Sequence, residues 1–321
     1  MSNVSCQDIS HWSDSVFATA YGLTSALGLP LNTLALLYFF RCAAVRSHTT
    51  VYMKNLACAD LLLAASLPVR VAFYAGAWHP KAPPRLACEI SGMVFLINMY
   101  ASIFFLACIS LDRCAAICFP MKSRLSGARR GAPWYSALVW LVVVGASLPP
   151  YLYLKLRELP EAQQNANTSN ISCIRCFEDR PAYVSDPAAL AFALLNGCVV
   201  PLATVLACSL ALLRSVRRSP AARQDWPRVR NTVAVTLAVF ALCFLPYHMV
   251  LLLMAVGPTP RNFDQAYHAA VPLACLNTVL DPVCYYFATE TFQKSPGVRA
   301  VRNALITNTG SDVHQRSRGN H

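Results

Sequence analysis

The sequence predicts an all-α membrane protein, a seven-transmembrane helix bundle followed by a short amphipathic C-terminal helix. Its composition excludes an ordinary soluble domain, because only 13% of the 321 residues are charged, whereas soluble domains carry about 25%. Seven apolar runs reach the roughly 20 residues that a helix needs to cross a bilayer, at 16–40, 51–74, 86–118, 134–156, 188–213, 232–256 and 267–287. Their length and lack of alternating polar positions favour helices over a β-barrel.

The predicted bundle forms a single domain, 1–321, with a segment 1–15 before the first run and a tail 288–321 after the last. The first run follows no charged segment with a short apolar stretch and a cleavage site, so we expect it to act as its own signal anchor. The tail carries Val298, Val301 and Leu305 at helical spacing beside Arg299 and Arg302. That pattern suits a helix on the inner leaflet, with a disordered basic tail as the alternative.

Basic residues assign the two sides of the membrane. With the N-terminus outside the cell, the cytoplasmic side holds 19 of the 27 Lys and Arg, as the positive-inside rule expects. Because these charges lie in short loops next to the membrane, a nucleic-acid partner is disfavoured. The glycosylation sequons then all lie outside, at Asn3, Asn167 and Asn170. We therefore expect a multi-pass plasma-membrane glycoprotein with an extracellular N-terminus and a cytoplasmic tail.

Four of the 14 cysteines fall on the outer side in this topology: Cys6, Cys88, Cys173 and Cys176. Cys88 opens the third run and Cys176 lies in the long outer loop 157–186. A disulfide between these two residues would tie the loop over the helix ends. Most of the other cysteines are scattered through the runs, where a thiol behaves as a small apolar group.

Three aspartates lie within the apolar runs, at Asp60, Asp112 and Asp281. A carboxylate in the middle of a membrane helix costs about 2.5–3.5 kcal/mol on insertion scales. Acids retained at that cost pair with another group, bind an ion or act in a switch. Their presence therefore indicates signalling or transport.

An ordered set of motifs runs through all seven segments and covers nearly the whole chain. The set consists of Asn32, Asn55-Leu56-Ala57 with Asp60, Cys88, Asp112-Arg113, Trp140, Pro201, Cys243-Phe244-Leu245-Pro246 and Asp281-Pro282-Val283-Cys284-Tyr285. With these residues the chain resembles the rhodopsin-like (class A) G-protein-coupled receptors. Each motif alone is weak evidence, whereas the whole set in this order is very specific.

The resemblance implies a switch that activates heterotrimeric G proteins, with arrestin as a further partner. Arg113 would be held by Asp112 at rest and freed to meet the G protein; an arginine that only snorkels at a helix end is the alternative. Cys114 stands where the family has tyrosine. The other residues that the resemblance assigns to the switch are Phe244, Pro246, Asp281 and Tyr285.

A second set of polar residues resembles the sodium pocket of this family. Asn98 and Ser102 are four residues apart, as are Asn277 and Asp281, so each pair shares one helix face. Together with Asp60 they would supply hard oxygen ligands for a small cation. Sodium is therefore the one ion that we expect, as an allosteric modulator, and a water-filled polar network is the alternative.

Several absences narrow the function. The seventh run has no lysine for a retinal Schiff base, and Phe95 stands where aminergic receptors carry aspartate. No zinc-protease motif, phosphate-cradling glycine loop or nucleophile elbow occurs, so the protein is not expected to be an enzyme. A transporter or channel would also use intramembrane acids, but paired internal repeats are missing.

Arg70 is the basic residue that the sequence places inside the outer half of a membrane helix. It lies ten residues beyond Asp60, a rise of about 15 Å. A salt bridge with Glu89 at the start of the third run is one interpretation, and an anion site is the other. The cations available near the rim of that site are Lys155, Arg157, Arg175, Arg180 and Arg261.

Further motifs resemble the purinergic-receptor-like cluster of this family, and within it the lysophosphatidic acid receptors. They are Gly28-Leu29-Pro30-Leu31-Asn32, Val51-Tyr52-Met53, Ser66-Leu67-Pro68-Val69-Arg70, Asn98-Met99-Tyr100, Cys108-Ile109-Ser110, Cys176-Phe177-Glu178 and Thr291-Phe292-Gln293-Lys294-Ser295. The cluster's usual cysteine in the third outer loop is absent, and we expect Cys173 to replace it as the partner of Cys6.

This resemblance implies a receptor for an extracellular lysophospholipid, with lysophosphatidic acid as the first expectation. Arg70 and the rim cations would hold the phosphate, and the other ligand-binding residues would be Phe95, Met99, Tyr100 and His248. A nucleotide or lysophosphatidylserine is the alternative. Nucleotide receptors of the cluster carry a basic residue three positions after the histidine, and here Leu251 follows His248. We expect coupling to Rho-activating G proteins, with the Gq type next.

Overall fold

The computed structural model describes residues 11–41, 48–77, 85–119, 131–164, 184, 186–218, 226–256 and 262–288. Within these ranges the chain is helical and has no strand. The helices are α1 (His11–Arg41), α2 (His48–Tyr74), α3 (Arg85–Cys118), α5 (Ala132–Gln164), α6 (Pro187–Leu194), η4 (Leu195–Val199), α7 (Val200–Arg218), α8 (Trp226–Val239), η6 (Phe240–Phe244), α9 (Leu245–Val256), α10 (Asn262–Cys275) and α11 (Asn277–Ala288). The expected amphipathic helix of the tail lies outside these ranges.

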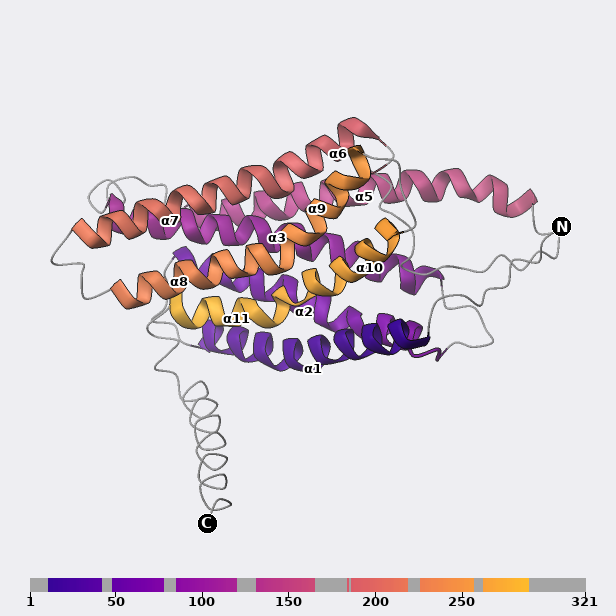
Figure 1. The fold of residues 1–321 in the computed structure, drawn as a ribbon, viewed down its shortest axis with the longest axis horizontal. Helices are drawn as coiled ribbons and strands as arrows, with labels where there is room; N and C mark the ends of the chain where they lie inside the picture. Colours follow the sequence, from indigo (N-terminus) through magenta and orange to yellow (C-terminus); the bar gives the residue numbers. More distant parts are fainter. Residues whose placement is uncertain are drawn as a thin grey trace, which may run out of the picture.

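These segments join into seven rods that run along the long axis of the molecule, one for each predicted apolar run (Figure 1). Three rods are composite: α6 continues through η4 into α7, α8 continues through η6 into α9, and α10 meets α11 at a turn at Leu276. Five rods are long and apolar enough to cross a membrane, and α5 contributes the apolar stretch Ala132–Leu148. The seventh rod consists of helices of 14 and 12 residues, each too short alone.

The rod α5 is longer than the sequence pattern predicts, because it continues to Gln164 and the apolar run ends at 156. The predicted outer loop 157–186 therefore begins as a helix. Its first residues include glutamate, alanine and glutamine, which are strong helix formers. Hydropathy detects only the part of a helix that lies in the bilayer, which explains why the boundary was wrong.

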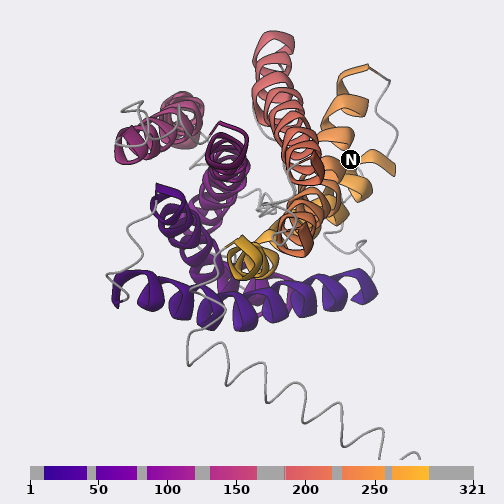
Figure 2. The same ribbon diagram turned by 90° about the vertical axis from the view of Figure 1, so that its left-hand side faces the viewer.

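The helix α3 is the central rod, since it packs against α2, α5 and α7 (Figure 2). We call the end of the bundle where α2 ends and α3 begins the Arg70 end, and the opposite end the Asp112 end. Large apolar side chains on α1 point outward, with Leu23 and Phe40 more than half exposed. The polar side chains Asp60, Asn98 and Asn277 are buried instead. This distribution suits a bundle surrounded by hydrocarbon.

Two prolines explain the two π-helical turns. Pro201 has no N–H to donate to the carbonyl of Gly197, and Pro246 has none for that of Leu242. In the preceding turns, the N–H of Val200 bonds the carbonyl of Leu195 and that of Leu245 bonds the carbonyl of Phe240. Both turns are therefore widened by one residue, and each lies where an α-helical hydrogen bond would have been lost.

Candidate functional site

Arg70 lies inside the bundle, and its side chain is only 4% exposed. Its guanidinium carbon is 5.5 Å from the ring centroid of Tyr21 on α1 and 5.4 Å from that of Phe95 on α3. The hydroxyl of Tyr21 also forms a hydrogen bond with Arg70. Aromatic faces attract a guanidinium, and the attraction strengthens when water is excluded. The cation is therefore held between two helices other than its own.

Further aromatic rings extend this arrangement into a continuous cluster. The ring of Tyr21 stacks on Tyr74 at 5.8 Å, and Phe95 meets Tyr247 edge to face at 5.7 Å. Tyr247 in turn lies 5.7 Å from Tyr267. We call this group the Arg70 cluster; it comprises Arg70, Tyr21, Tyr74, Phe95, Tyr247 and Tyr267, and it draws on α1, α2, α3, α9 and α10.

The cluster contains four tyrosines, of which Tyr21 contacts the guanidinium of Arg70 with its ring. Their neutral hydroxyls can donate hydrogen bonds. Sequence reasoning identified Arg70 and Phe95 but missed the four tyrosines. Tyr74 could have been found, because it follows Arg70 by four residues and shares its helix face. The other three come from helices whose register against α2 no sequence pattern reveals.

His248 and Tyr100 form a second contact, between α9 and α3, beside the π turn η4. Their rings are 6.1 Å apart between centroids. The His248 Nδ1 lies 2.8 Å from the carbonyl of Phe244, and its Nε2 is buried with no hydrogen-bond partner in the described part of the chain. A Cβ at Gly197 would lie 3.1 Å from that Nε2 and would overlap the ring of Tyr100. Glycine is therefore required where η4 meets the two rings.

The remaining predicted ligand residues are only partly described. Met99 is buried at 1% exposure, one turn after Phe95 on α3. Lys155 and Arg157 lie on α5, whose backbone is described there while their side chains are not. Arg175, Arg180 and Arg261 lie outside the described residues, as do the sequons at Asn3, Asn167 and Asn170.

Cys88 is disulfide-bonded and 8% exposed. The cysteines expected as partners in the two disulfides, Cys6, Cys173 and Cys176, lie outside the described residues. The pairing of Cys88 with Cys176 and that of Cys6 with Cys173 therefore stay predictions. Within the described ranges the other cysteines of the helices, such as Cys243 and Cys284, are free.

The residues predicted to hold sodium come together in the middle of the bundle. Asn98 Nδ2 donates to Asp60 Oδ1 at 3.0 Å, and Asn277 Nδ2 donates to Ser102 Oγ at 2.9 Å. Each of these side chains, like that of Asp281, is at most 2% exposed. We call the five the polar cluster. It joins α2, α3 and α11, as the sequence predicts.

Asp281 has the fewest hydrogen bonds of the carboxylates in the polar cluster, as far as the described residues show. Neither of its buried carboxylate oxygens has a hydrogen-bond partner of normal geometry among the described residues. A buried carboxylate in that position is costly unless it is protonated or neutralised by a cation. Among the described residues, Asp60 accepts one hydrogen bond from Asn98 and one, at 3.5 Å, from the Tyr285 hydroxyl, so its carboxylate can accept a further ligand. The donor set of two carboxylates, amide oxygens and a hydroxyl fits a small hard cation.

At the Asp112 end, Asp112 accepts a hydrogen bond from the hydroxyl of Thr49 on α2. Sequence reasoning did not identify Thr49. Tyr285, a member of the predicted switch, is fully buried; its ring meets Phe39 at 5.7 Å and its hydroxyl reaches Asp60. This residue therefore connects the polar cluster to α1.

The rods α7 and α8 close against each other at the Asp112 end. Val216 of α7 and Val233 of α8 belong to one small apolar cluster, against which Cys114 and Cys118 of α3 pack. The guanidinium carbon of Arg217 lies 4.8 Å from the ring centroid of Trp226, where α8 begins. Arg113 lies next to Cys114 on α3. The segment 114–118, which follows this arginine on α3, therefore packs against α7 and α8.

Comparison with known proteins identifies this architecture. Residues 31–285 match the family described as 7 transmembrane receptor (rhodopsin family). The chain is 34% identical to lysophosphatidic acid receptor 6 of Mus musculus over 305 residues, which cover 88% of this chain and 85% of the relative. It is 34% identical to lysophosphatidic acid receptor 5 of Bos taurus, covering 91% and 81%. It is also 34% identical to purinoceptor 2 of Rattus norvegicus, covering 84% and 73%.

Proposed function

Because the chain belongs to the rhodopsin family of seven-transmembrane receptors, we propose that it is a cell-surface receptor for an extracellular lysophospholipid, lysophosphatidic acid in the first place. Receptors of this family act through G proteins and are not enzymes. The N-terminus and the Arg70 end face the outside in this proposal, which agrees with the concentration of Lys and Arg on the other side.

The observation that carries the ligand assignment is the buried guanidinium of Arg70 among tyrosines. A phosphate monoester needs positive charge and several hydrogen-bond donors, and a guanidinium offers both in a planar fork. The hydroxyl of Tyr21, which is hydrogen-bonded to Arg70, and those of Tyr74 and Tyr267 in the same cluster would add neutral donors. The relatives named for lysophosphatidic acid support the same choice.

The burial of Arg70 also explains how binding would be coupled to a change of shape. With 4% of the side chain exposed, a phosphate reaches the guanidinium only after neighbouring rings move. The nearest rings belong to α1 and α3. Because Phe95 contacts Tyr247, a displacement of Phe95 would also displace the side chain of Tyr247 on α9. An agonist that binds the rearranged cluster more tightly shifts the population toward it.

The acyl chain would continue from the phosphate along Phe95, Met99 and Tyr100 toward the rods α5 and α6–α7. His248 would line this path beside Tyr100. The rim cations Lys155, Arg157, Arg175, Arg180 and Arg261 would complete the phosphate site. The path is apolar along α3, which suits a hydrocarbon chain and gives it affinity through burial.

The polar cluster would hold sodium as an allosteric modulator. Asp60, Asn98, Ser102, Asn277 and Asp281 supply its oxygens. A bound cation would neutralise the buried carboxylate of Asp281 and favour the resting arrangement. Arg113 would carry the signal to a Rho-activating or Gq-type G protein, with arrestin as a second cytoplasmic partner.

A nucleotide is the second candidate ligand, favoured by the similarity to the rat purinoceptor. A nucleotide also carries phosphate, and its base would stack on the aromatic rings of the Arg70 cluster. The leucine at position 251, where a basic residue would bind further phosphates, argues against it. Lysophosphatidylserine remains an alternative within the lipid class.

The deciding experiment measures nucleotide exchange on added G proteins in membranes that contain the receptor. Lysophosphatidic acid, lysophosphatidylserine, ATP and UTP are applied side by side. We expect lysophosphatidic acid to act at the lowest concentration. A response to a nucleotide at lower concentration than to any lysophospholipid would overturn the assignment.

A further inference from the structure

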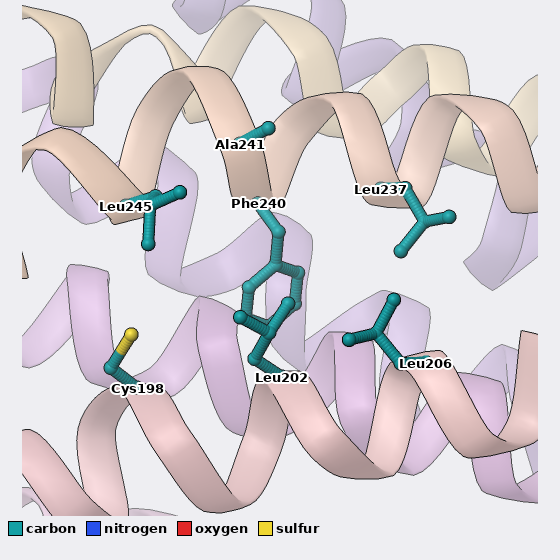
Figure 3. Close-up of a pocket in the computed structure, with 7 residues that line it drawn as sticks. All are labelled: Cys198, Leu202, Leu206, Leu237, Phe240, Ala241 and Leu245. Carbon is teal, nitrogen blue, oxygen red and sulfur yellow. The ribbon is translucent and has the colours of Figure 1, made fainter.

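A crevice lies between the rods α6–α7 and α8–α9, away from the Arg70 and polar clusters (Figure 3). Its volume is about 250 Å³. One wall consists of Cys198, Leu202 and Leu206, and the other of Leu237, Phe240, Ala241 and Leu245. In Figure 3 the ring of Phe240 extends across the crevice toward Leu202. The two π turns, η4 and η6, each contribute to a wall.

The crevice opens toward the surroundings of the bundle. Of its lining residues, Leu206 is 43% exposed and Leu245 is 37% exposed. On the core side, Phe240 is 3% exposed, so the crevice is closed toward the interior. Both rods are long and apolar enough to cross a membrane. The medium that reaches the opening is therefore the hydrocarbon of the bilayer.

The chemistry of the lining selects the occupant. Apart from one thiol, every lining side chain is a hydrocarbon, so an ordered water would lack the two to four polar partners that it needs. A lipid headgroup would lose its hydration without any compensating hydrogen bond. A volume of about 250 Å³ is also just below the roughly 300–1,000 Å³ of pockets that enclose whole small molecules. Part of a hydrocarbon chain fits all three constraints.

We propose that this crevice is a binding site for one acyl chain of a phospholipid from the surrounding bilayer. The chain enters from the side, while its headgroup stays at the membrane surface. Its methylene groups restore the dispersion contacts that an empty crevice between Leu202 and Phe240 would lack. This site is separate from the one assigned to the agonist, because Phe240 closes it toward the interior.

The position of the crevice links its occupancy to the receptor switch. Phe240 meets Phe244 edge to face at 5.4 Å, and Phe244 belongs to the Cys243-Phe244-Leu245-Pro246 motif. The walls belong to the same two rods that close at the Asp112 end through Val216 and Val233. A chain that fits the crevice in this arrangement stabilises this arrangement relative to one in which the rods have separated.

The experiment uses the full-length receptor in phosphatidylcholine nanodiscs that contain a small fraction of phosphatidylcholine with a diazirine in its acyl chain. After illumination, labelled peptides are identified by mass spectrometry. We expect labelling to concentrate on 198–206 and 237–245. Ala241→Trp fills the crevice with an indole and should reduce labelling of 198–206 at least fivefold. Leu202→Phe fills it from the other wall and should reduce labelling of 237–245.

Ala207→Trp is the matched control, because Ala207 is an exposed alanine of α7 outside the crevice lining. It should leave the labelling unchanged. Equal labelling of all lipid-facing helices, or labelling of 198–206 that persists in Ala241→Trp, would overturn the proposal. If Ala241→Trp does not reach the membrane, Leu202→Phe decides the question by the same criterion.

The link to the switch is tested separately and rests on the proposed function. Ala241→Trp should raise the half-effective concentration of lysophosphatidic acid at least threefold relative to Ala207→Trp, because the indole stabilises the closed rods. An unchanged concentration would contradict the link. A wild-type receptor that ignores lysophosphatidic acid would contradict the ligand assignment, whereas the labelling result would still test the crevice.

Discussion

The guanidinium of Arg70 lies over the ring of Phe95, with 5.4 Å between its central carbon and the ring centroid. This contact joins α2 to α3 at the Arg70 end of the bundle. A cation held against aromatic faces with little water around it interacts more strongly with an anion than one in solution. The pair therefore places a buried positive charge between α2 and α3, where we propose that the phosphate binds.

Replacement of Arg70 should damage the response to lysophosphatidic acid. Loss of one side of a buried charged pair costs about 2–5 kcal/mol, so Arg70→Ala should raise the half-effective concentration by about 30-fold or more, at about 1.4 kcal/mol per factor of ten. Arg70→Lys should recover only part of the response, because an ammonium lacks the planar fork. Concentration–response curves at matched surface expression provide the measurement.

Glu89→Ala is the control for a purely structural role of Arg70. If Arg70 serves only to pair with Glu89, both alanine variants should lose surface expression to a similar extent. A variant Arg70→Ala that reaches the surface and responds like the wild type would contradict the phosphate assignment.

Substitution by alanine should have opposite effects on stability at two glycines, Gly197 in η4 and Gly145 in α5. Gly197→Ala places a methyl group against Tyr100 and His248, and such overpacking costs about 1–3 kcal/mol. Gly145 has nothing within 4 Å of the same position, so Gly145→Ala should stabilise the receptor by up to about 1 kcal/mol through helix propensity. Thermal unfolding of the purified receptor should shift down for the first variant and up for the second.

Sodium should lose its effect when Asp60 is neutralised. Asp60→Asn keeps the shape of the side chain but removes most of its attraction for a cation. Sodium should then no longer lower agonist affinity, as measured by agonist binding with sodium or a large organic cation as the salt. Asp186→Asn is the control, since Asp186 is an exposed acid that caps α6, and asparagine caps a helix equally well. Unchanged sodium sensitivity in Asp60→Asn would favour a water-filled network.

Arg113→Ala should separate binding from activation. If this arginine meets the G protein, its loss should abolish nucleotide exchange, whereas agonist binding at the opposite end of the bundle should persist. Arg41→Ala removes an exposed arginine from the last turn of α1 and should leave exchange about the same as in the wild type. Wild-type exchange in Arg113→Ala would show that this arginine only anchors the end of α3.

The partner of the bonded Cys88 should be Cys176. Mass spectrometry of unreduced peptides from the purified receptor should recover this pair and a second pair of Cys6 with Cys173. Recovery of Cys88 with Cys173 would contradict both assignments at once.

Much of the fold follows from local chemistry that the sequence displays. Apolar length predicted one rod for each run, because hydrocarbon forces each segment to satisfy its own backbone as a helix. The polar cluster was also predicted, since Asn98 and Ser102, and Asn277 and Asp281, already share a helix face by spacing. The predicted end of α5 at residue 156 was wrong, because the helix continues to Gln164. Beyond the bilayer, helix formation depends on helix propensity and no longer on hydropathy.

The sequence by itself determined the seven spans, the family motifs and the choice of Arg70 as the unusual cation. The tertiary structure decided what surrounds that cation. Tyr21, Tyr247 and Tyr267 come from three helices, and their meeting with Arg70 depends on how those helices are rotated and shifted against α2. Packing of side chains from distant parts of the chain sets that rotation, and such contacts leave no periodic signal in any single segment.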